Sequence, residues 1–394
     1  MKTNNQKIII IGGGVIGTSI AYHLAKSGAA HVTLVEAGDL ASGSSGACDG
    51  LVFMQSKKPG VHLELAMASV ERFAALQEEL PVNIEFSRTG GLVVIETEAE
   101  YRAMEKFVAE QQAIGLDVRL LDQEQLVQKE PCLSKELLGA SYSSLDAQVN
   151  PINLTLGFGL AAEKCQVTIL KHTRVIDLLT SGNCVTGVAT TGGKLKADIV
   201  VNAGGSMAGE IAAMVDMQIP VQPRRGQIVV TSGGADQERL LKHCLLSAKY
   251  IAAKYDPEIA AQAGQGVSME QTDNGNLLLG STREFVGFDK ETTVDGIRGI
   301  IKQTTSILPA LKHMHVIRTF AGLRPYSPDG LPVLGRSDCL DGLVTAAGHE
   351  GDGIALAPIT GELMAKMILG QKQEIDLTPF SPDRFAGKEE QSNG

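Results

Sequence analysis

The chain lacks the cysteine patterns that hold metals or build disulfide frameworks. Its six cysteines are dispersed over 394 residues and include no C-x-x-C pair. This spacing argues against a zinc site, an iron–sulfur cluster held by this chain, and a disulfide-rich secreted fold. The histidines at 172, 243, 313 and 315 add no metal-ligand spacing supported by nearby cysteines or carboxylates. We therefore expect no metal site, and a reducing cytoplasm fits this cysteine usage best.

The sequence also lacks basic blocks and long apolar runs. No run of Lys and Arg exceeds two residues, the formal net charge is −10, and the pI is near 5.4. Nucleic acid and anionic membranes would repel such a protein, so neither is expected as its main partner. Residues 8–22 are uncharged, as in a signal peptide, but four glycines among them favour a nucleotide-binding turn. No other segment approaches the length of a membrane-spanning helix, so we expect a cytoplasmic protein that reaches a membrane only through a partner.

A glycine-rich turn directly behind an apolar strand is the strongest motif in the chain. Gly12, Gly14 and Gly17 form G-x-G-x-x-G between a predicted strand over residues 8–11 and a predicted helix over 18–26. The first glycine permits a tight turn, the second lets a pyrophosphate approach, and the third lets helix and strand pack closely. The phosphates would then lie at the helix N-terminus, where free backbone N–H groups and the positive end of the dipole favour anions.

A carboxylate follows at the spacing that this motif requires. The predicted second strand, over residues 31–35, ends in Glu36, nineteen residues after Gly17. Glu36 can accept hydrogen bonds from the ribose hydroxyls of an adenosine, and its charge would repel the extra phosphate of NADP. The sequence thus predicts an adenine dinucleotide, although the motif alone does not separate FAD from NAD.

The order of predicted elements indicates two interleaved domains. Strands and helices alternate up to a helix over residues 63–80, and alternating runs such as 92–96 then indicate a different sheet, while 139–150 reads as a loop. Apolar strands that run into glycine near residues 204 and 348 return the chain to the first sheet. We expect an α/β fold (α+β overall), in which a Rossmann-like three-layer domain formed by residues 1–80, 145–219 and 320–385 binds the dinucleotide. The substrate domain, residues 81–144 and 220–319, would be built on an antiparallel or mixed β-sheet.

Several motifs spread over nearly the full length carry a family resemblance. Besides the N-terminal fingerprint they are S-S-G-A at 44–47, V-V-N-A-G-G at 200–205, P-R-R-G-Q at 223–227, G-L-R-P at 322–325, D-G-L-P at 329–332 and the glycine-rich run 348–361. Together they resemble the flavin-dependent amine and amino-acid oxidoreductases of the D-amino-acid oxidase superfamily. The most similar group contains glycine oxidase, the sarcosine oxidase β subunit, and the β subunits of proline, hydroxyproline and opine dehydrogenases and of hydrogen cyanide synthase. The late glycine motifs favour FAD, because a simple NAD-dependent dehydrogenase does not explain them.

The resemblance implies which positions contact FAD. The turn would hold the pyrophosphate, Glu36 the ribose, and the loop at 44–46 the phosphates and one side of the isoalloxazine. The 348–354 corner would lie beside the pyrimidine end of the flavin, where N–H groups at a helix start stabilise the anionic reduced ring. The implied FAD-contacting set is Gly12, Gly14, Val15, Ile16, Gly17, Glu36, Ser44, Ser45, Gly46, Val175, Ala203, Gly204, Gly348, Gly351, Asp352, Gly353 and Ile354.

The resemblance also implies three residues for substrate. Arg324 of G-L-R-P would bind a substrate carboxylate, a task that suits its planar fork, and the alternative is a structural ion pair. Tyr250 is similar to a tyrosine that assists with the carboxylate in glycine oxidase, and Tyr255 competes for that assignment. His349 could act as an acid or base, or simply bond the backbone or line the flavin face.

The sequence differs from the glycine oxidase pattern at positions that bear on the substrate and on the subunit type. Gly351 stands where glycine oxidase carries an arginine, which argues against glycine as substrate. The combination of A-C-D-G at 47–50, Q-S-K-K-P-G at 55–60 and E-G-D at 350–352 is more similar to the multi-subunit dehydrogenases. Arg224 and Arg225 contact a partner, an acid across the domain junction, or solvent, and Cys48 receives no role.

We expect a catalytic β subunit that oxidises the Cα–N bond of a small amino or imino acid. The candidate classes are proline or hydroxyproline, an opine, glycine or sarcosine, and a D-amino acid. Hydride transfer to flavin N5 would give an imine, and electrons would pass to a partner subunit with a second flavin or an iron–sulfur centre. The alternatives are a stand-alone glycine or D-amino-acid oxidase that uses O2, and a non-catalytic dinucleotide-binding subunit.

Overall fold

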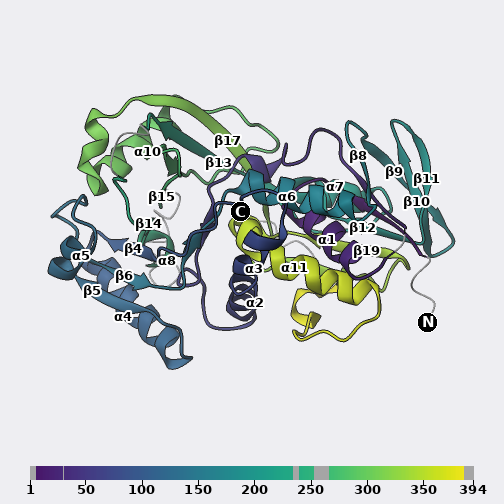
Figure 1. The fold of residues 1–394 in the computed structure, drawn as a ribbon, viewed down its shortest axis with the longest axis horizontal. Coiled ribbons are helices and arrows are strands. Elements are labelled where there is room, and N and C mark those ends of the chain that lie inside the picture. Colours follow the sequence, from purple (N-terminus) through teal and green to yellow (C-terminus); the bar gives the residue numbers. More distant parts are fainter. Residues whose placement is uncertain (1–5, 30, 234–238, 253–265, 386–394) are drawn as a thin grey trace, which may run out of the picture.

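Two large β-sheets, each with its own helices, make up the two halves of the molecule in Figure 1. The computed structural model describes residues 6–29, 31–233, 239–252 and 266–385. One sheet has six strands and the other has eight, and the chain passes between them several times. This confirms the mixed α/β fold that the sequence predicts.

The six-stranded sheet is built around the isoleucine run. In spatial order its strands are β18 (Val333–Arg336), β19 (Leu343–Ala347), β12 (Ile199–Asn202), β1 (Lys7–Ile11), β2 (His31–Val35) and β8 (Thr168–Leu170). Neighbouring strands are parallel except for β18, which runs antiparallel to β19. A central parallel strand is covered on both faces, which explains why β1 is apolar without alternation.

Three layers form because successive isoleucines of β1 point to opposite faces of the sheet. Ile8 and Ile10 join the core beneath the helices, whereas Ile9 and Ile11 join a separate core on the other face. The helices on the first face are α1 (Val15–Lys26), α6 (Pro151–Lys164) and α11 (Gly353–Ile368). The second face is covered by an antiparallel three-stranded sheet of β9 (Val175–Ser181), β10 (Cys184–Thr190) and β11 (Gly193–Lys196).

The eight-stranded sheet is mixed, as predicted. In spatial order its strands are β17 (Val316–Tyr326), β13 (Gln222–Thr231), β16 (Leu277–Gly280), β15 (Ser268–Gln271), β14 (Cys244–Ser247), β4 (Gly91–Ile95), β6 (Gly139–Ser143) and β5 (Arg119–Asp122). Only the β14–β4 pair is parallel. The other elements in this half are α4 (Glu98–Ala113), α5 (Gln123–Lys129), α8 (Lys249–Ala252) and α10 (Val294–Ile307). The long β13–β17 ladder reaches from this sheet toward the cofactor half and positions the site described below.

Two local predictions are wrong. The predicted helix over 63–80 is two helices, α2 (Val61–Val70) and α3 (Phe73–Glu79), and Arg72 between them is held by Ala68, Glu362 and Glu374. The predicted loop over 139–150 contains β6 and the short β7 (Ala147–Gln148), which pairs with β3 (Leu51–Val52). β6 consists of small and polar residues and lacks the alternation of apolar and polar residues that predicts a strand. It lies between β4 and β5 in the sheet, and four of its five residues are buried. The division of the chain into five domain segments stays a prediction.

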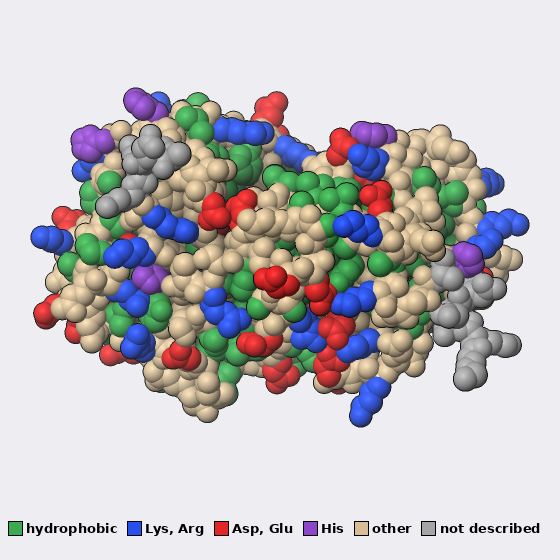
Figure 2. Space-filling view, viewed as in Figure 1, with side chains coloured by type: hydrophobic (Ala, Val, Ile, Leu, Met, Phe, Trp, Pro, Cys, Tyr) green, Lys and Arg blue, Asp and Glu red, His purple; other side chains and the backbone are tan. Residues whose placement is uncertain are grey.

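Three further features concern the charge on one face, the lengths of the helices and the clustering of possible metal ligands. Figure 2 shows Lys and Arg side chains mixed with Asp and Glu over one face, with no continuous basic block on that face. No helix within the described residues has both the length and the apolar character needed to cross a bilayer. In the same part of the chain, no group of three or more His, Cys, Asp or Glu side chains could hold a metal ion.

Candidate active site

A cavity of about 680 Å³ lies where the two sheets meet. Its wall includes Gly12 at the end of β1, Glu36 at the end of β2, Ala203 at the end of β12 and Arg324 on β17. The carboxyl ends of parallel strands are where α/β folds bind dinucleotides. The cavity therefore joins the predicted cofactor turn and the predicted substrate arginine in a single space.

The three glycines of the turn each have a different role. Gly12 has φ +110°, and a Cβ there would lie 2.4 Å from the carbonyl oxygen of Ala203. A Cβ at Gly17 would lie 2.0 Å from the carbonyl oxygen of Gly12, so strand and helix could not pack as they do. At Gly14 the only close atom is Ser45 Oγ at 3.2 Å, and the residue lines the cavity. A bare backbone at this point leaves room for a pyrophosphate to approach.

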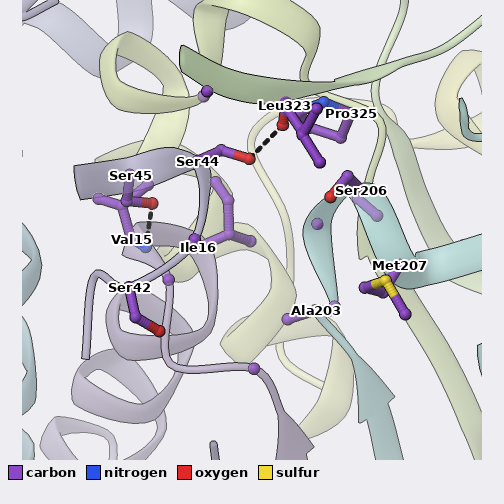
Figure 3. A pocket seen from close by; sticks show the side chains of 18 of the residues that line it. Val15, Ile16, Ser42, Ser44, Ser45, Ala203, Ser206, Met207, Leu323 and Pro325 are labelled. Carbon is purple, nitrogen blue, oxygen red and sulfur yellow. Dashed lines mark hydrogen bonds between the residues drawn. The ribbon is translucent and has the colours of Figure 1, made fainter. Parts of the chain in front are cut away.

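The first residues of α1 line the cavity, and no side chain of the N-cap residue caps the helix. Gly14 occupies the N-cap position, and the N–H of Val15 donates instead to Ser45 Oγ at 3.0 Å. Ser44, the neighbour of Ser45, donates its hydroxyl hydrogen bond to the carbonyl of Leu323 on β17. Figure 3 shows this loop on one side of the pocket, with Ala203, Ser206 and Met207 on another. Such a helix start offers N–H groups and a positive dipole end to phosphates.

Glu36 is fixed at the end of β2 by backbone donors. Its Oε2 accepts from the N–H of Gly13 at 2.6 Å, and its Oε1 accepts from the N–H of Gly38 at 2.7 Å. A carboxylate oxygen has more than one lone pair, so these bonds leave acceptor capacity for ribose hydroxyls. The carboxylate is thus preorganised for the adenosine half of a dinucleotide.

Arg324 is positioned by β17 and, in the part of the chain that the structure describes, has no acidic partner. Its Nη1 donates to the carbonyl of Thr282 at 3.1 Å, and its Nη2 donates to the hydroxyl of Ser281. Among the described residues no carboxylate forms an ion pair with it, so the structural ion-pair alternative has no support. The guanidinium lies over Gly226, where a Cβ would be 2.1 Å from Nη1. The remaining N–H groups of the fork are available to a planar anion such as a carboxylate.

The two arginines at 224 and 225 contact acids rather than solvent. Arg224 lies directly opposite Arg324 in the β13–β17 ladder and forms an ion pair with Glu350 of the C-terminal corner. Burial, together with the charges of Arg283 and Arg324, lowers the pKa of Arg224 to about 10. Arg225 is buried and pairs with Glu284. The ion pair between Arg224 and Glu350 therefore ties the two halves of the molecule together beside the cavity.

These features coincide with a match to a known family. The family model described as FAD dependent oxidoreductase matches residues 7–367. The chain belongs to this family. Its turn, helix start and Glu36 fit FAD, because the glycines leave open the space that a side chain would otherwise fill.

Curated relatives cover nearly the whole chain. It is 32% identical to hydrogen cyanide synthase subunit HcnC of Pseudomonas protegens over 96% of each chain. It is 30% identical to glycine oxidase of Geobacillus kaustophilus over 98% of this chain and 99% of that protein.

Solved structures agree. The crystal structure of that glycine oxidase gives a TM-score of 0.87 at 28% identity, with 96% of this chain and 98% of that chain covered. The L-proline dehydrogenase from P. horikoshii gives 0.86 at 29% identity, with 96% and 97% covered. Family, fold and FAD as cofactor are therefore confirmed as predicted.

The C-terminal corner of this FAD-dependent oxidoreductase is held by buried polar contacts. His349 is 3% exposed, its Nε2 lies 3.2 Å from the hydroxyl of Thr360, and burial lowers its pKa to about 3. The imidazole is thus neutral at physiological pH, which favours the packing alternative over acid–base work. Although burial opposes it, Lys57 at 2.8 Å and the neighbouring His62 hold the pKa of Asp352 well below its usual range.

Most predicted positions line the cavity, and a few support it from behind. The lining set is Gly12, Gly14, Val15, Ile16, Glu36, Ser44, Ser45, Val175, Ala203, Gly204, Arg324, His349, Gly351, Gly353 and Ile354. Those outside the lining are Gly17, Gly46, Tyr250, Gly348 and Asp352. The ring of Tyr250 is covered by the guanidinium of Arg283 at 3.5 Å, and Tyr255 lies outside the described residues. The individual contacts to FAD and substrate stay predictions.

Sequence reasoning missed several residues at the FAD cavity. Asp49, Phe288 and Lys290 line it, and Lys57 is buried beneath the corner with 2% of its area exposed. For Asp49, in the A-C-D-G segment, and for Lys57, in the segment 55–60, the sequence carries only a resemblance to the multi-subunit dehydrogenases and no specific role. The burial of Lys57 could not be predicted, because it depends on the ion pair with Asp352, which lies far away along the chain.

Proposed function

We propose that the protein oxidises the Cα–N bond of a small amino or imino acid. The observation that carries this proposal is Arg324, which lies in the FAD cavity with no acidic partner among the described residues. An unpaired guanidinium beside a redox cofactor suits a substrate with a carboxylate close to the bond that is oxidised. Glycine oxidase and L-proline dehydrogenase, both named for amino or imino acids, support the same class.

The chemistry divides between the cofactor and the chain. FAD, when bound, accepts a hydride from the substrate carbon. The chain contributes positioning: Arg324 holds the carboxylate, and Gly226 leaves room for its guanidinium. The neutral His349 packs beside the site. Fixing the carboxylate fixes where the α-hydrogen lies relative to the cofactor, and such orientation alone supplies a large part of a rate enhancement.

The subunit role of the chain is the finer part of the proposal. We favour a catalytic β subunit that passes electrons to a partner with a second flavin or an iron–sulfur centre, in the cytoplasm or at a membrane through that partner. HcnC, at 32% identity, is by its name a subunit of a synthase, which supports this assignment. The second candidate is a stand-alone oxidase that uses O2, favoured by the glycine oxidase match at 30% identity. Against glycine itself stands Gly351, which offers no side chain for a carboxylate.

The test is an anaerobic screen of the purified, FAD-loaded protein. Proline, hydroxyproline, sarcosine, glycine, an opine and D-amino acids are added in turn, and the flavin absorption bands are followed. We expect one class to bleach the bands, and expect the reduced protein to react faster with an artificial electron acceptor than with O2. Rapid reoxidation by O2 would favour the stand-alone oxidase, and no bleaching by any amino or imino acid would contradict the proposal.

A further inference from the structure

A carboxylate shares the cavity wall with Arg324. The loop that carries Asp49 runs along β17: Ser44 donates to the carbonyl of Leu323, and a Cβ at Gly322 would lie 2.1 Å from the carbonyl of Ala47. Asp49 and Arg324 both line the cavity, and within the described residues they form no ion pair with each other. The cavity therefore presents separate negative and positive groups, as recognition of a zwitterion requires.

Asp49 is held in place from the substrate sheet. The hydroxyl of Ser268 donates to its Oδ2 at 2.8 Å. Next to it lies Glu270, which is 5% exposed and whose Oε2 accepts from the N–H of Gly50 at 2.9 Å. Burial, and then the charge of Asp49, raise the pKa of Glu270 to about 8. Glu270 therefore favours its protonated form near neutral pH, and of the two carboxyl groups only that of Asp49 lines the cavity.

In the described part of the chain, no second carboxylate packed around this pair lines the cavity. The charged and titratable groups near it come from several elements and are Cys48, Asp146, Arg239, Cys244 and Arg324. Burial raises the pKa of both thiols well above the usual value, so both are neutral. Burial also raises the pKa of Asp146, to about 6, and two backbone N–H groups and Gln55 occupy its oxygens. Asp49 is thus the carboxylate placed to meet a ligand.

We infer that Asp49 accepts the proton that the substrate ammonium must lose before its α-hydrogen can leave. The inference rests on the proposed function. The N–H bond breaks, an O–H bond forms on Asp49, and the electron pair stays on nitrogen. When the hydride then leaves the α-carbon with two electrons, that nitrogen pair forms the C=N bond of the imine. The proton on Asp49 passes to solvent before the next turnover. Ser268 and Glu270 act as positioning residues, since each contacts or flanks the Asp49 loop without lining the cavity.

The experiment compares FAD-loaded Asp49→Asn with the wild type. The rate constant of flavin reduction is measured anaerobically across pH, with the substrate found by the screen. At pH 7 the variant should lose about 100-fold, because general-base catalysis typically contributes that much or more. The rate should recover at high pH, where water removes the ammonium proton. Asp49→Glu, which restores a carboxylate, should recover part of the rate at pH 7.

A matched control and a second variant keep the test decisive. Asp39→Asn removes an exposed carboxylate outside the cavity and should keep the wild-type profile. Ser268→Ala removes the donor that favours the charged form of Asp49, so the acid limb of the profile should move to higher pH. If Asp49→Asn reduces its flavin with the wild-type pH profile, or if Ser268→Ala leaves the acid limb in place, the inference is overturned while the proposed function stands. Failure of the wild type to be reduced at any pH would overturn the proposed function itself.

Discussion

Removal of the Arg324 guanidinium should weaken substrate binding far more than FAD binding. Arg324→Met removes the guanidinium that we propose holds the substrate carboxylate, while the glycine turn and Glu36 are untouched. Truncating one member of a buried charge pair costs about 2 to 5 kcal/mol. Arg324 is half-buried, so the lower part of this range applies, about 2 to 3 kcal/mol, or about a 30- to 150-fold rise in the apparent Kd.

The variant also leaves two protein acceptors without their donor. The carbonyl of Thr282 and the hydroxyl of Ser281 both lose a hydrogen bond from Arg324. Each loss costs about 1 kcal/mol if water does not replace it, so the free energy of unfolding should fall by about 1 to 2 kcal/mol. Arg324→Lys keeps the charge without the fork and should give an intermediate Kd.

The assay separates binding from folding. Anaerobic titration of flavin reduction gives the substrate Kd and the limiting rate, flavin absorbance gives the FAD content, and thermal melting gives stability. Arg318→Met is the matched control, because Arg318 lies on the same strand and is exposed. An unchanged substrate Kd in a fully loaded Arg324→Met protein would refute the assignment of the carboxylate to this residue.

Three other perturbations have expected outcomes. Gly17→Ala forces a Cβ to 2.0 Å from a backbone oxygen, so it should lower the FAD content and should lower the free energy of unfolding by about 1 to 3 kcal/mol. Gly299→Ala, where a Cβ meets nothing within 4 Å, is the control and should change neither quantity. Equal melting curves for the two variants would contradict this prediction. Glu36→Gln should weaken FAD binding by about 1 to 2 kcal/mol in titrations of the apoprotein, and an unchanged Kd would remove Glu36 from the ribose site. Although burial opposes it, hydrogen bonds from Arg72 and a lysine lower the pKa of Glu362 to about 2, so its stabilising contribution is complete above the usual value of 4.5 and is lost as pH falls toward 2. Acid unfolding curves should show that loss in the wild type and a smaller one in Arg72→Met.

The parts of the site that depend on local backbone geometry could be predicted from sequence. The turn was predictable because Gly12 and Gly17 are imposed by contacts within one strand–turn–helix unit and its neighbour. Arg324 was predictable only through its G-L-R-P motif, since one arginine among many carries no signal by itself. The neutral state of His349 was not predictable, because it follows from burial by segments distant in the chain.

The polar pairs across the chain could not be predicted. Gly50 and Glu270 are 220 residues apart in sequence, and the contact exists only because β15 of one sheet meets the loop after β2 of the other. The same holds for Lys57 and Asp352, separated by 295 residues. No periodicity encodes such a meeting, and β6, with its small and polar residues, shows that even a strand can lack the pattern that sequence reasoning seeks.

The ladder between β13 and β17 has a consequence for how this enzyme could change during evolution. The pairing places Arg224 opposite Arg324, and side chains alternate strictly between the faces of a strand. An insertion or deletion of a single residue in β17 immediately before Leu323 would rotate the guanidinium away from the cavity and bring an apolar neighbour in its place. The irregularity between Val230 and Thr231 shows that this ladder accommodates an extra residue of β17 farther from the cavity, so a change of length beside Arg324 would alter the site whereas one at the far end of the strand would not.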